Sequence, residues 1–120
     1  MKYKVLIIGA NGMVGNTFLK YFSSNRKYSV AGTVRNKNSL SKLPNKNSYN
    51  LYEGIDAENF RNFLPIFKKF NPDVVINCIG SIKQKNDTYS YSQFINLNSL
   101  LPHCLAELSK KFKFRFIHLS

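Results

Sequence analysis

Three equally spaced glycines, set between an apolar run and a helical pattern, constrain this chain more than any other feature. Gly9, Gly12 and Gly15 follow the apolar residues 5–8, and the helical pattern begins at Met13. The first glycine allows a sharp turn off a strand, the second lets a ligand approach the backbone, and the third lets the helix pack closely on the sheet. A diphosphate would then lie against free N–H groups at the positive end of the helix dipole. The stretch predicts a dinucleotide-binding turn, and a strand, turn and helix without a ligand is the alternative.

Strand and helix patterns alternate along the rest of the chain. Apolar runs predict strands at 3–8, 28–34, 49–55, 73–79 and 112–119. Helical spacing predicts helices at 13–22, 57–70 and 89–111, with polar connections at 36–48 and 80–87. Pro65 and Pro102 lie inside two of these helical patterns, where we expect them to kink or shorten the helix. The alternation favours one α/β domain over residues 1–120, a three-layer, Rossmann-type doubly wound parallel sheet in the order 3-2-1-4-5.

The chain is strongly basic, with a formal net charge of +12. Most of the cations are lysines spread along the chain, and the only arginines are Arg26, Arg35, Arg61 and Arg115. Base recognition favours the planar fork of arginine, so we expect no nucleic-acid partner. The charge would still attract phosphorylated ligands in a general way.

The sequence predicts a cytoplasmic protein without a disulfide or a metal site. No apolar run approaches the roughly 20 residues that cross a bilayer, and the first run is too short for a signal peptide, so we expect a cytoplasmic protein. Cys78 and Cys104 lie far apart, and we expect both to be reduced and buried. His103 and His118 are isolated and are interpreted as packed or surface residues, so no metal site is expected.

Five stretches of the sequence fit one known pattern: residues 8–15, Asp56, and residues 73–80, 95–98 and 116–120. With them the chain resembles the extended short-chain dehydrogenase/reductase family. More narrowly, it is similar to the amino-terminal part of dTDP-4-dehydrorhamnose reductases and related sugar-nucleotide reductases or epimerases. The resemblance implies an oxidoreductase that acts on a nucleotide-activated sugar.

The resemblance also implies which residues hold a nicotinamide dinucleotide. Within the loop that ends at Gly15, the residues lining the diphosphate would be Gly9, Asn11, Gly12, Met13 and Val14. Asp56 would accept a hydrogen bond from the adenine amino group, with Ile55 or Ala57 beside the ring. Asp56 also suits the N-cap of the helix that follows it, and the two roles are compatible.

The nicotinamide half of the cofactor is assigned in the same way. The residues that pass the ribose and nicotinamide would be Cys78, Ile79 and Gly80. Asn96 matches a helix asparagine that shapes the site from behind, and an ordinary helix residue is the alternative.

The end of the second predicted strand suggests which dinucleotide is bound. NAD sites usually place a carboxylate there for the ribose 2′-hydroxyl, and residues 32–36 contain none. Arg35 could instead pair with a 2′-phosphate, and Thr33 could add a hydroxyl. We therefore expect NADP, with NAD possible, and Arg35 as a simple surface residue is the alternative.

The catalytic pair of the resembled family is missing from the sequence. That family uses Tyr-x-x-x-Lys, in which the ammonium lowers the phenol pKa, and no lysine stands four residues after any of the seven tyrosines. Ser120 is expected to be a neighbour of the catalytic hydroxyl. The chain is therefore interpreted as the cofactor-binding portion of such an enzyme, truncated after the fifth strand, without the catalytic helix and substrate domain, and inactive alone. A dinucleotide-sensing, NmrA-like regulator without catalysis is the alternative, and the oligomeric state stays open.

Overall fold

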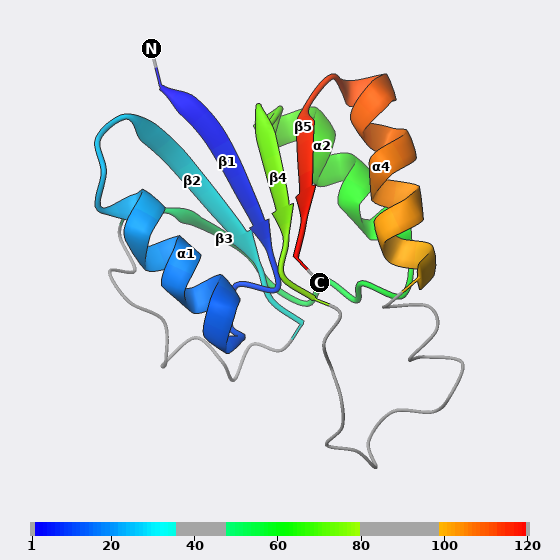
Figure 1. The fold of residues 1–120 in the computed structure, drawn as a ribbon, viewed down its shortest axis with the longest axis horizontal. Helices are drawn as coiled ribbons and strands as arrows, with labels where there is room; N and C mark the ends of the chain where they lie inside the picture. The colour runs from blue at the N-terminus through cyan, green and yellow to red at the C-terminus, as the bar shows by residue number, and fades with distance from the viewer. Residues whose placement is uncertain (1, 36–47, 80–98, 120) are drawn as a thin grey trace.

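Five parallel strands form a single sheet in a computed structural model that describes residues 2–35, 48–79 and 99–119 (Figure 1). The strands are β1 (Tyr3–Ile8), β2 (Tyr28–Thr33), β3 (Asn50–Tyr52), β4 (Val74–Asn77) and β5 (Arg115–His118). Their order is β3-β2-β1-β4-β5 and every neighbouring pair is parallel. The predicted α/β class and the strand order 3-2-1-4-5 are confirmed.

Helices cover the two faces of the sheet separately. Helix α1 (Met13–Ser23) packs on β1 and β2, and α2 (Leu64–Phe70) and α4 (Leu101–Phe112) lie on the opposite face (Figure 1). Side chains of a strand alternate between faces, so β1 contributes to both cores. Val5 and Ile7 pack with α1, whereas Leu6 and Ile8 pack with α2 and α4.

Phenylalanines dominate the core on the α2 and α4 face. Phe63 and Phe67 are almost completely buried, and the ring centroid of Phe67 lies 4.9 Å from that of Phe114. Complete burial of such a side chain stabilises the fold by about 1.5–3 kcal/mol. This core fixes α2 and α4 against β4 and β5, and it thereby sets the position of the carboxyl ends of these strands.

The prolines begin helices in the structure. The expected helix over 57–70 is shorter: a 3-10 turn, η2 (Phe60–Phe63), leads into α2, and Pro65 lies in the first turn of α2. Pro102 likewise lies in the first turn of α4. A first-turn N–H has no partner within the helix, so proline is tolerated there. The expected shortening is confirmed for the helix that holds Pro65. Residues 89–98 of the other expected helix lie outside the described residues, so the bend expected at Pro102 stays a prediction.

One other boundary and the burial of the cysteines differ from expectation. The third strand is only three residues long, because Gly54 turns the chain with φ +68° shortly after Tyr52. Cys78 and Cys104 are free thiols as expected, although each is only half-buried. The predicted elements at 89–98, and the positions of Gly80, Asn96 and Ser120, lie outside the described residues.

Candidate functional site

The glycine turn joins β1 to α1, and two of its glycines are required by the fold. Gly9 has φ +81°, and a Cβ placed on it would lie 2.7 Å from Cγ1 of Ile79. A Cβ on Gly15 would collide with the carbonyl oxygen of Gly9. The tight turn and the close helix–strand approach predicted for these two positions are therefore present.

Gly12 differs from its two neighbours in the motif. Its φ of −76° is open to any residue, and the nearest atom to a Cβ there would be the carbonyl oxygen of Gly9 at 3.7 Å. The fold itself would accept a side chain at this exposed position. Because Gly12 has no Cβ, a ligand has space to approach the backbone at this point.

Helix α1 begins at this bare position, so its N-cap residue supplies no capping side chain. Gly12 is its N-cap, and its first turn contains no acidic residue. The first N–H groups of a helix have no partner inside it, and they carry the positive end of the helix dipole. The N–H groups of Met13 and Val14 are therefore suited to a diphosphate, and both side chains are exposed beside them.

Thr33 stabilises the glycine turn through two hydrogen bonds. Its side chain is almost fully buried, its Oγ1 accepts a hydrogen bond from the N–H of Gly9 at 3.3 Å, and its carbonyl accepts one from Ala10 at 2.9 Å. The structure thus gives this hydroxyl a contact inside the protein, and its contact with a cofactor stays a prediction. Arg35 lies two residues further on and is exposed, as a residue that meets a ligand phosphate must be.

The residues expected at the adenine end lie in a turn after β3. Oδ1 of Asp56 accepts a hydrogen bond from the N–H of Glu58 at 3.0 Å. The helical turn begins later, and its N-cap is Asn59, whose Oδ1 accepts from Arg61 at 3.1 Å. The interpretation of Asp56 as a helix N-cap is therefore wrong, because it closes a separate turn. Ala57 is buried in the core under α2. Of the two residues expected beside the adenine ring, the half-buried Ile55 is therefore favoured.

The end of β4 runs alongside the glycine turn. The N–H of Cys78 donates to the carbonyl of Ile8 at 2.9 Å, and the side chain of Ile79 packs against Gly9. Burial raises the pKa of the Cys78 thiol to about 11, so this thiol is protonated near neutral pH. Two of the three residues expected beside the nicotinamide therefore lie next to the expected diphosphate loop.

Sequence analysis missed one pair of residues at this edge. Asn77, the last residue of β4, is fully buried and lies 3.2 Å from His118 Nδ1 through its Nδ2. Its Oδ1 accepts a hydrogen bond from the N–H of Ile79 at 3.2 Å. His118 is exposed, as its interpretation as a packed or surface residue allows, and this contact gives it one polar partner. A polar residue inside the apolar run 73–79 was the available signal.

Nearly all the predicted residues that can be located thus meet at one place, where the parallel strands end. Ligands of doubly wound sheets bind at this carboxyl edge. None of the helices that the structure describes is long and apolar enough to span a membrane. Among the same residues no three His, Cys, Asp or Glu side chains gather as metal ligands would.

Comparison with known proteins agrees with this geometry. The model of a family described as "NAD dependent epimerase/dehydratase family" matches residues 5–120. A dTDP-glucose 4,6-dehydratase of Haemophilus influenzae is 21% identical over 131 residues, which cover 97% of this chain and 38% of the relative. The chain thus spans less than half the length of the curated relative that it matches.

Two solved structures illustrate the shared fold. UDP-glucuronic acid 4-epimerase from Bacillus cereus in complex with NAD has a TM-score of 0.75 and 20% identity, and the match covers 98% of this chain and 39% of the epimerase. The enzyme WbmG of Bordetella bronchiseptica, in complex with NAD and UDP, has a TM-score of 0.77 and 15% identity, and the match covers 98% of this chain and 37% of WbmG. At these identities the similarity shows the fold.

Proposed function

Because the chain belongs to the NAD dependent epimerase/dehydratase family, we propose that it binds a nicotinamide dinucleotide for chemistry on a nucleotide-activated sugar. The observation that carries the proposal is the contrast among the three glycines. The fold requires Gly9 and Gly15, whereas Gly12 leaves an open surface in front of the first turn of α1. An anion at this point would meet first-turn N–H groups beside an N-cap residue that has no side chain of its own.

The chain's own residues would bind and orient this cofactor. The first-turn N–H groups of α1 would hold the diphosphate, with Met13 and Val14, 88% and 49% exposed, covering it from outside. Asp56 would hydrogen-bond the adenine, because its carboxylate is exposed at the same edge. Cys78 and Ile79 would flank the ribose and nicotinamide of the cofactor. A bound nicotinamide dinucleotide supplies hydride transfer to and from a sugar carbon.

The sugar-nucleotide part of the proposal is supported by the relatives. The reported ones are a dTDP-glucose dehydratase, a UDP-glucuronic acid epimerase and an enzyme crystallised with NAD and UDP. Reduction of a dTDP-4-keto sugar is the narrower proposal, and it is supported by sequence resemblance alone. The family match does not favour the regulator considered above.

A preference for NADP is the second narrower proposal. It is supported by Arg35, which is exposed at the end of β2, and by the lack of a carboxylate in residues 32–36. A guanidinium there would pair with a 2′-phosphate in a bidentate manner.

Fluorescence titration with NADPH and NADH tests the proposal. We expect saturable binding of both, and loss of binding in Gly12→Val, because the added side chain would occupy the space of the diphosphate. Thr17→Val, one helical turn further along α1, is the matched control and should bind as the parent does. Equal affinity of Gly12→Val and the parent protein would contradict the proposal.

Turnover gives an independent measurement. Residues 1–120 contain no Tyr-x-x-x-Lys pair, so we expect this polypeptide to bind the dinucleotide without reducing a dTDP-4-keto sugar. Absorbance of NADPH at 340 nm would follow the reaction. A steady decrease above the rate without protein would contradict this expectation.

A further inference from the structure

Among the described residues, two polar side chains are buried at the carboxyl edge of the sheet, one on each side of β1. Thr33 ends β2 and is 2% exposed, and Asn77 ends β4 and is fully buried. Both are register partners of Ile8, the last residue of β1. Residues in register point to the same face of a sheet, so the three side chains form one row on the face that α2 and α4 cover.

Each of the two polar side chains binds a main-chain N–H that lies just beyond the end of a strand. Oγ1 of Thr33 accepts from the N–H of Gly9 at 3.3 Å, and Oδ1 of Asn77 accepts from the N–H of Ile79 at 3.2 Å. These oxygens take the place of the carbonyl that a continuing strand pair would supply. Thr33 therefore fixes the first residue of the glycine turn, and Asn77 fixes the backbone where the chain leaves β4.

The amide of Asn77 is held from its other side as well. Its Nδ2 lies 3.2 Å from Nδ1 of His118, the last residue of β5. Because the amide oxygen faces Ile79 and the nitrogen faces His118, only one orientation of the side chain satisfies both contacts. Burial of an amide is costly unless it is hydrogen-bonded, whereas the neighbouring position in the row holds the apolar Ile8. We therefore relate the amide at position 77 to the course of the segment that follows it.

The two segments that Thr33 and Asn77 hold lie against each other. The side chain of Ile79 packs against Gly9, and a Cβ on that glycine would lie 2.7 Å from Cγ1 of Ile79. In the proposed function, the glycine turn faces the diphosphate, and residues 78–79 flank the ribose and nicotinamide. The two halves of the cofactor would therefore meet backbone that is fixed by two different side chains.

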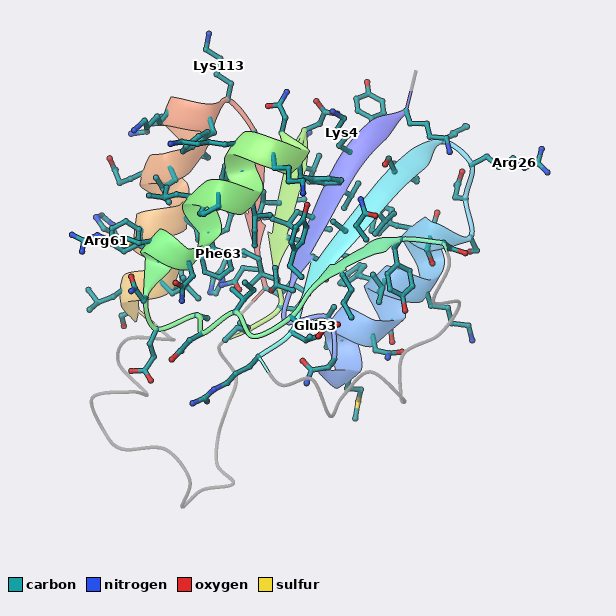
Figure 2. All side chains as sticks on the ribbon, turned by 180° about the vertical axis from the view of Figure 1, so that it is seen from behind. Lys4, Arg26, Glu53, Arg61, Phe63 and Lys113 are labelled. Atoms are coloured by element: carbon teal, nitrogen blue, oxygen red, sulfur yellow. The ribbon has the colours of Figure 1, made fainter. Side chains whose placement is uncertain are left out.

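The lysines labelled in Figure 2 lie at the edge away from this backbone. Lys4 and Lys113 lie at the amino edge, where the strands begin, whereas Glu53 lies at the carboxyl edge (Figure 2). A diphosphate at the carboxyl edge would therefore be bound by main-chain N–H groups rather than by these two lysines. The direction of such N–H groups depends on the course of the backbone, which Thr33 and Asn77 fix.

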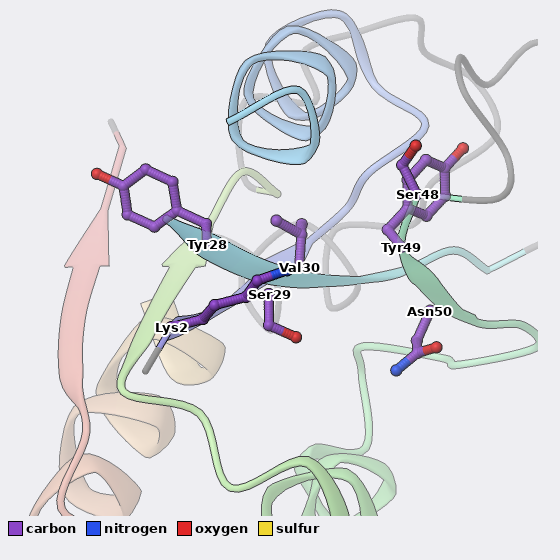
Figure 3. Close-up of a pocket in the computed structure, with 7 residues that line it drawn as sticks. All are labelled: Lys2, Tyr28, Ser29, Val30, Ser48, Tyr49 and Asn50. Carbon is purple, nitrogen blue, oxygen red and sulfur yellow. The ribbon is translucent and has the colours of Figure 1, made fainter. Parts of the chain in front are cut away.

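An open hollow at the amino edge does not compete for the cofactor. It measures about 240 Å³, and its lining residues include Lys2, Ser29 and Asn50 (Figure 3). Pockets that enclose whole small molecules measure roughly 300–1,000 Å³, so this hollow is too small for a dinucleotide.

We propose that Asn77 is a positioning residue for the nicotinamide half of the cofactor, whereas Thr33 positions the diphosphate half. This inference rests on the proposed function, because it requires a nicotinamide dinucleotide at the carboxyl edge. Asn77 acts through the backbone at Ile79 and does not itself contact the cofactor. Its loss should therefore weaken the binding of the nicotinamide and leave the rest of the dinucleotide bound as before.

Calorimetric titration with two ligands tests the proposal. NADPH carries both halves, and 2′-phospho-ADP-ribose lacks the nicotinamide ring. Asn77→Leu removes the acceptor of the Ile79 N–H, so the affinity for NADPH should fall by roughly fivefold or more, while the affinity for 2′-phospho-ADP-ribose should change by less than about twofold. Thr33→Val removes the acceptor of the Gly9 N–H and should weaken the binding of both ligands by a similar factor.

Two further variants separate positioning from a general loss of stability. Asn77→Asp keeps an acceptor for the N–H of Ile79, so the ratio of the two affinities should stay within about twofold of that of the parent protein. The added charge acts on both ligands alike, because they carry the same phosphates. Asn50→Leu, at an exposed position of β3, is the matched control and should leave both affinities unchanged.

The fluorescence of bound NADPH gives a second readout. In the parent protein the dihydronicotinamide would be held next to residues 78–79, and in Asn77→Leu its emission at saturation should move toward that of free NADPH. If Asn77→Leu does not fold, His118→Phe provides the same test, because it keeps a ring at an exposed position and removes the acceptor of Nδ2 of Asn77. It should change the two affinities in the same unequal manner, with a smaller loss for NADPH.

Several outcomes would overturn the proposal. They are equal losses for the two ligands in Asn77→Leu, a loss confined to NADPH in Thr33→Val, and equal affinities of the parent protein for NADPH and 2′-phospho-ADP-ribose. A parent protein that binds neither ligand would overturn the proposed function, and this inference with it.

Discussion

Asn77 and His118, the last residues of β4 and β5, share a hydrogen bond that fixes the tautomer of the histidine. Oδ1 of Asn77 accepts from the N–H of Ile79, so its Nδ2 must donate to Nδ1 of His118, 3.2 Å away. Nδ1 is then without a proton, and Nε2 carries it. The pair ties two strand ends together beside the candidate dinucleotide site.

Asn77→Asp should reverse this tautomer. A carboxylate only accepts, so it would still bind the N–H of Ile79 but would require the proton on Nδ1 of His118. Nitrogen-15 NMR of the neutral imidazole distinguishes the two forms. An unchanged Nε2–H form in Asn77→Asp would contradict the geometry.

Loss of the buried amide should also lower stability. Asn77 is fully buried, and Asn77→Ala would leave the N–H of Ile79 without its partner, at a cost of about 1–3 kcal/mol. Urea unfolding would measure the loss. Asn50→Ala, at an exposed position of β3, is the control and should change stability by less than about 0.5 kcal/mol.

Gly15→Ala and Gly12→Ala should separate the structural from the ligand-binding role of the glycine motif. The Cβ at position 15 would collide with the carbonyl of Gly9, so we expect a loss of about 1–3 kcal/mol or more in the free energy of unfolding. At position 12 the nearest atom is 3.7 Å away, so the folded state should keep its stability. Similar unfolding midpoints for the two variants would contradict the collision expected between a Cβ at position 15 and the carbonyl oxygen of Gly9.

Arg35→Ala should discriminate between the two dinucleotides. A charge-assisted hydrogen bond contributes about 1.5–3 kcal/mol, so affinity for NADPH should fall by roughly tenfold or more, with little change for NADH. Arg61→Ala removes another exposed arginine and serves as the control. A parallel loss for NADPH and NADH in Arg35→Ala would argue against contact with the 2′-phosphate.

Cys78 should react slowly with alkylating reagents at neutral pH. Burial raises its pKa from 9.0 to about 11, and the thiolate is the reactive form. In Cys104→Ser, which leaves Cys78 as the only thiol, the iodoacetamide rate should rise up to about pH 11. A rate that levels off near pH 9 would contradict the burial of this thiol.

The same shift has a consequence for stability. The unfolded chain ionises Cys78 near its usual value of 9.0, whereas the folded protein retains the neutral thiol up to about 11. The free energy of unfolding is therefore unaffected by this group below pH 9, and it falls as the pH rises from 9 to 11, because the unfolded chain loses the thiol proton first. Cys78→Ser should reduce this alkaline loss, which thermal unfolding between these pH values would measure.

Local spacing was sufficient to predict the strand order and the glycine turn. The apolar run at 5–8 and the positions of Gly9 and Gly15 act over a few residues, and the alternation of strand and helix patterns indicates the order of the sheet. Element boundaries were less predictable, because Pro65 suits both the interior of a kinked helix and its first turn. Packing of Phe63 and Phe67 selected the second arrangement.

The sequence by itself determined that a bare glycine loop would lie between a buried strand and a helix, because the residues concerned are neighbours along the chain. Tertiary structure decided which distant residues would meet. It alone joined Thr33 to Gly9 and Asn77 to His118, and it alone carried lysines from separate elements to the amino edge. In a parallel sheet every strand begins at one edge and ends at the other, so residues at equivalent ends of distant strands become neighbours only when the sheet forms.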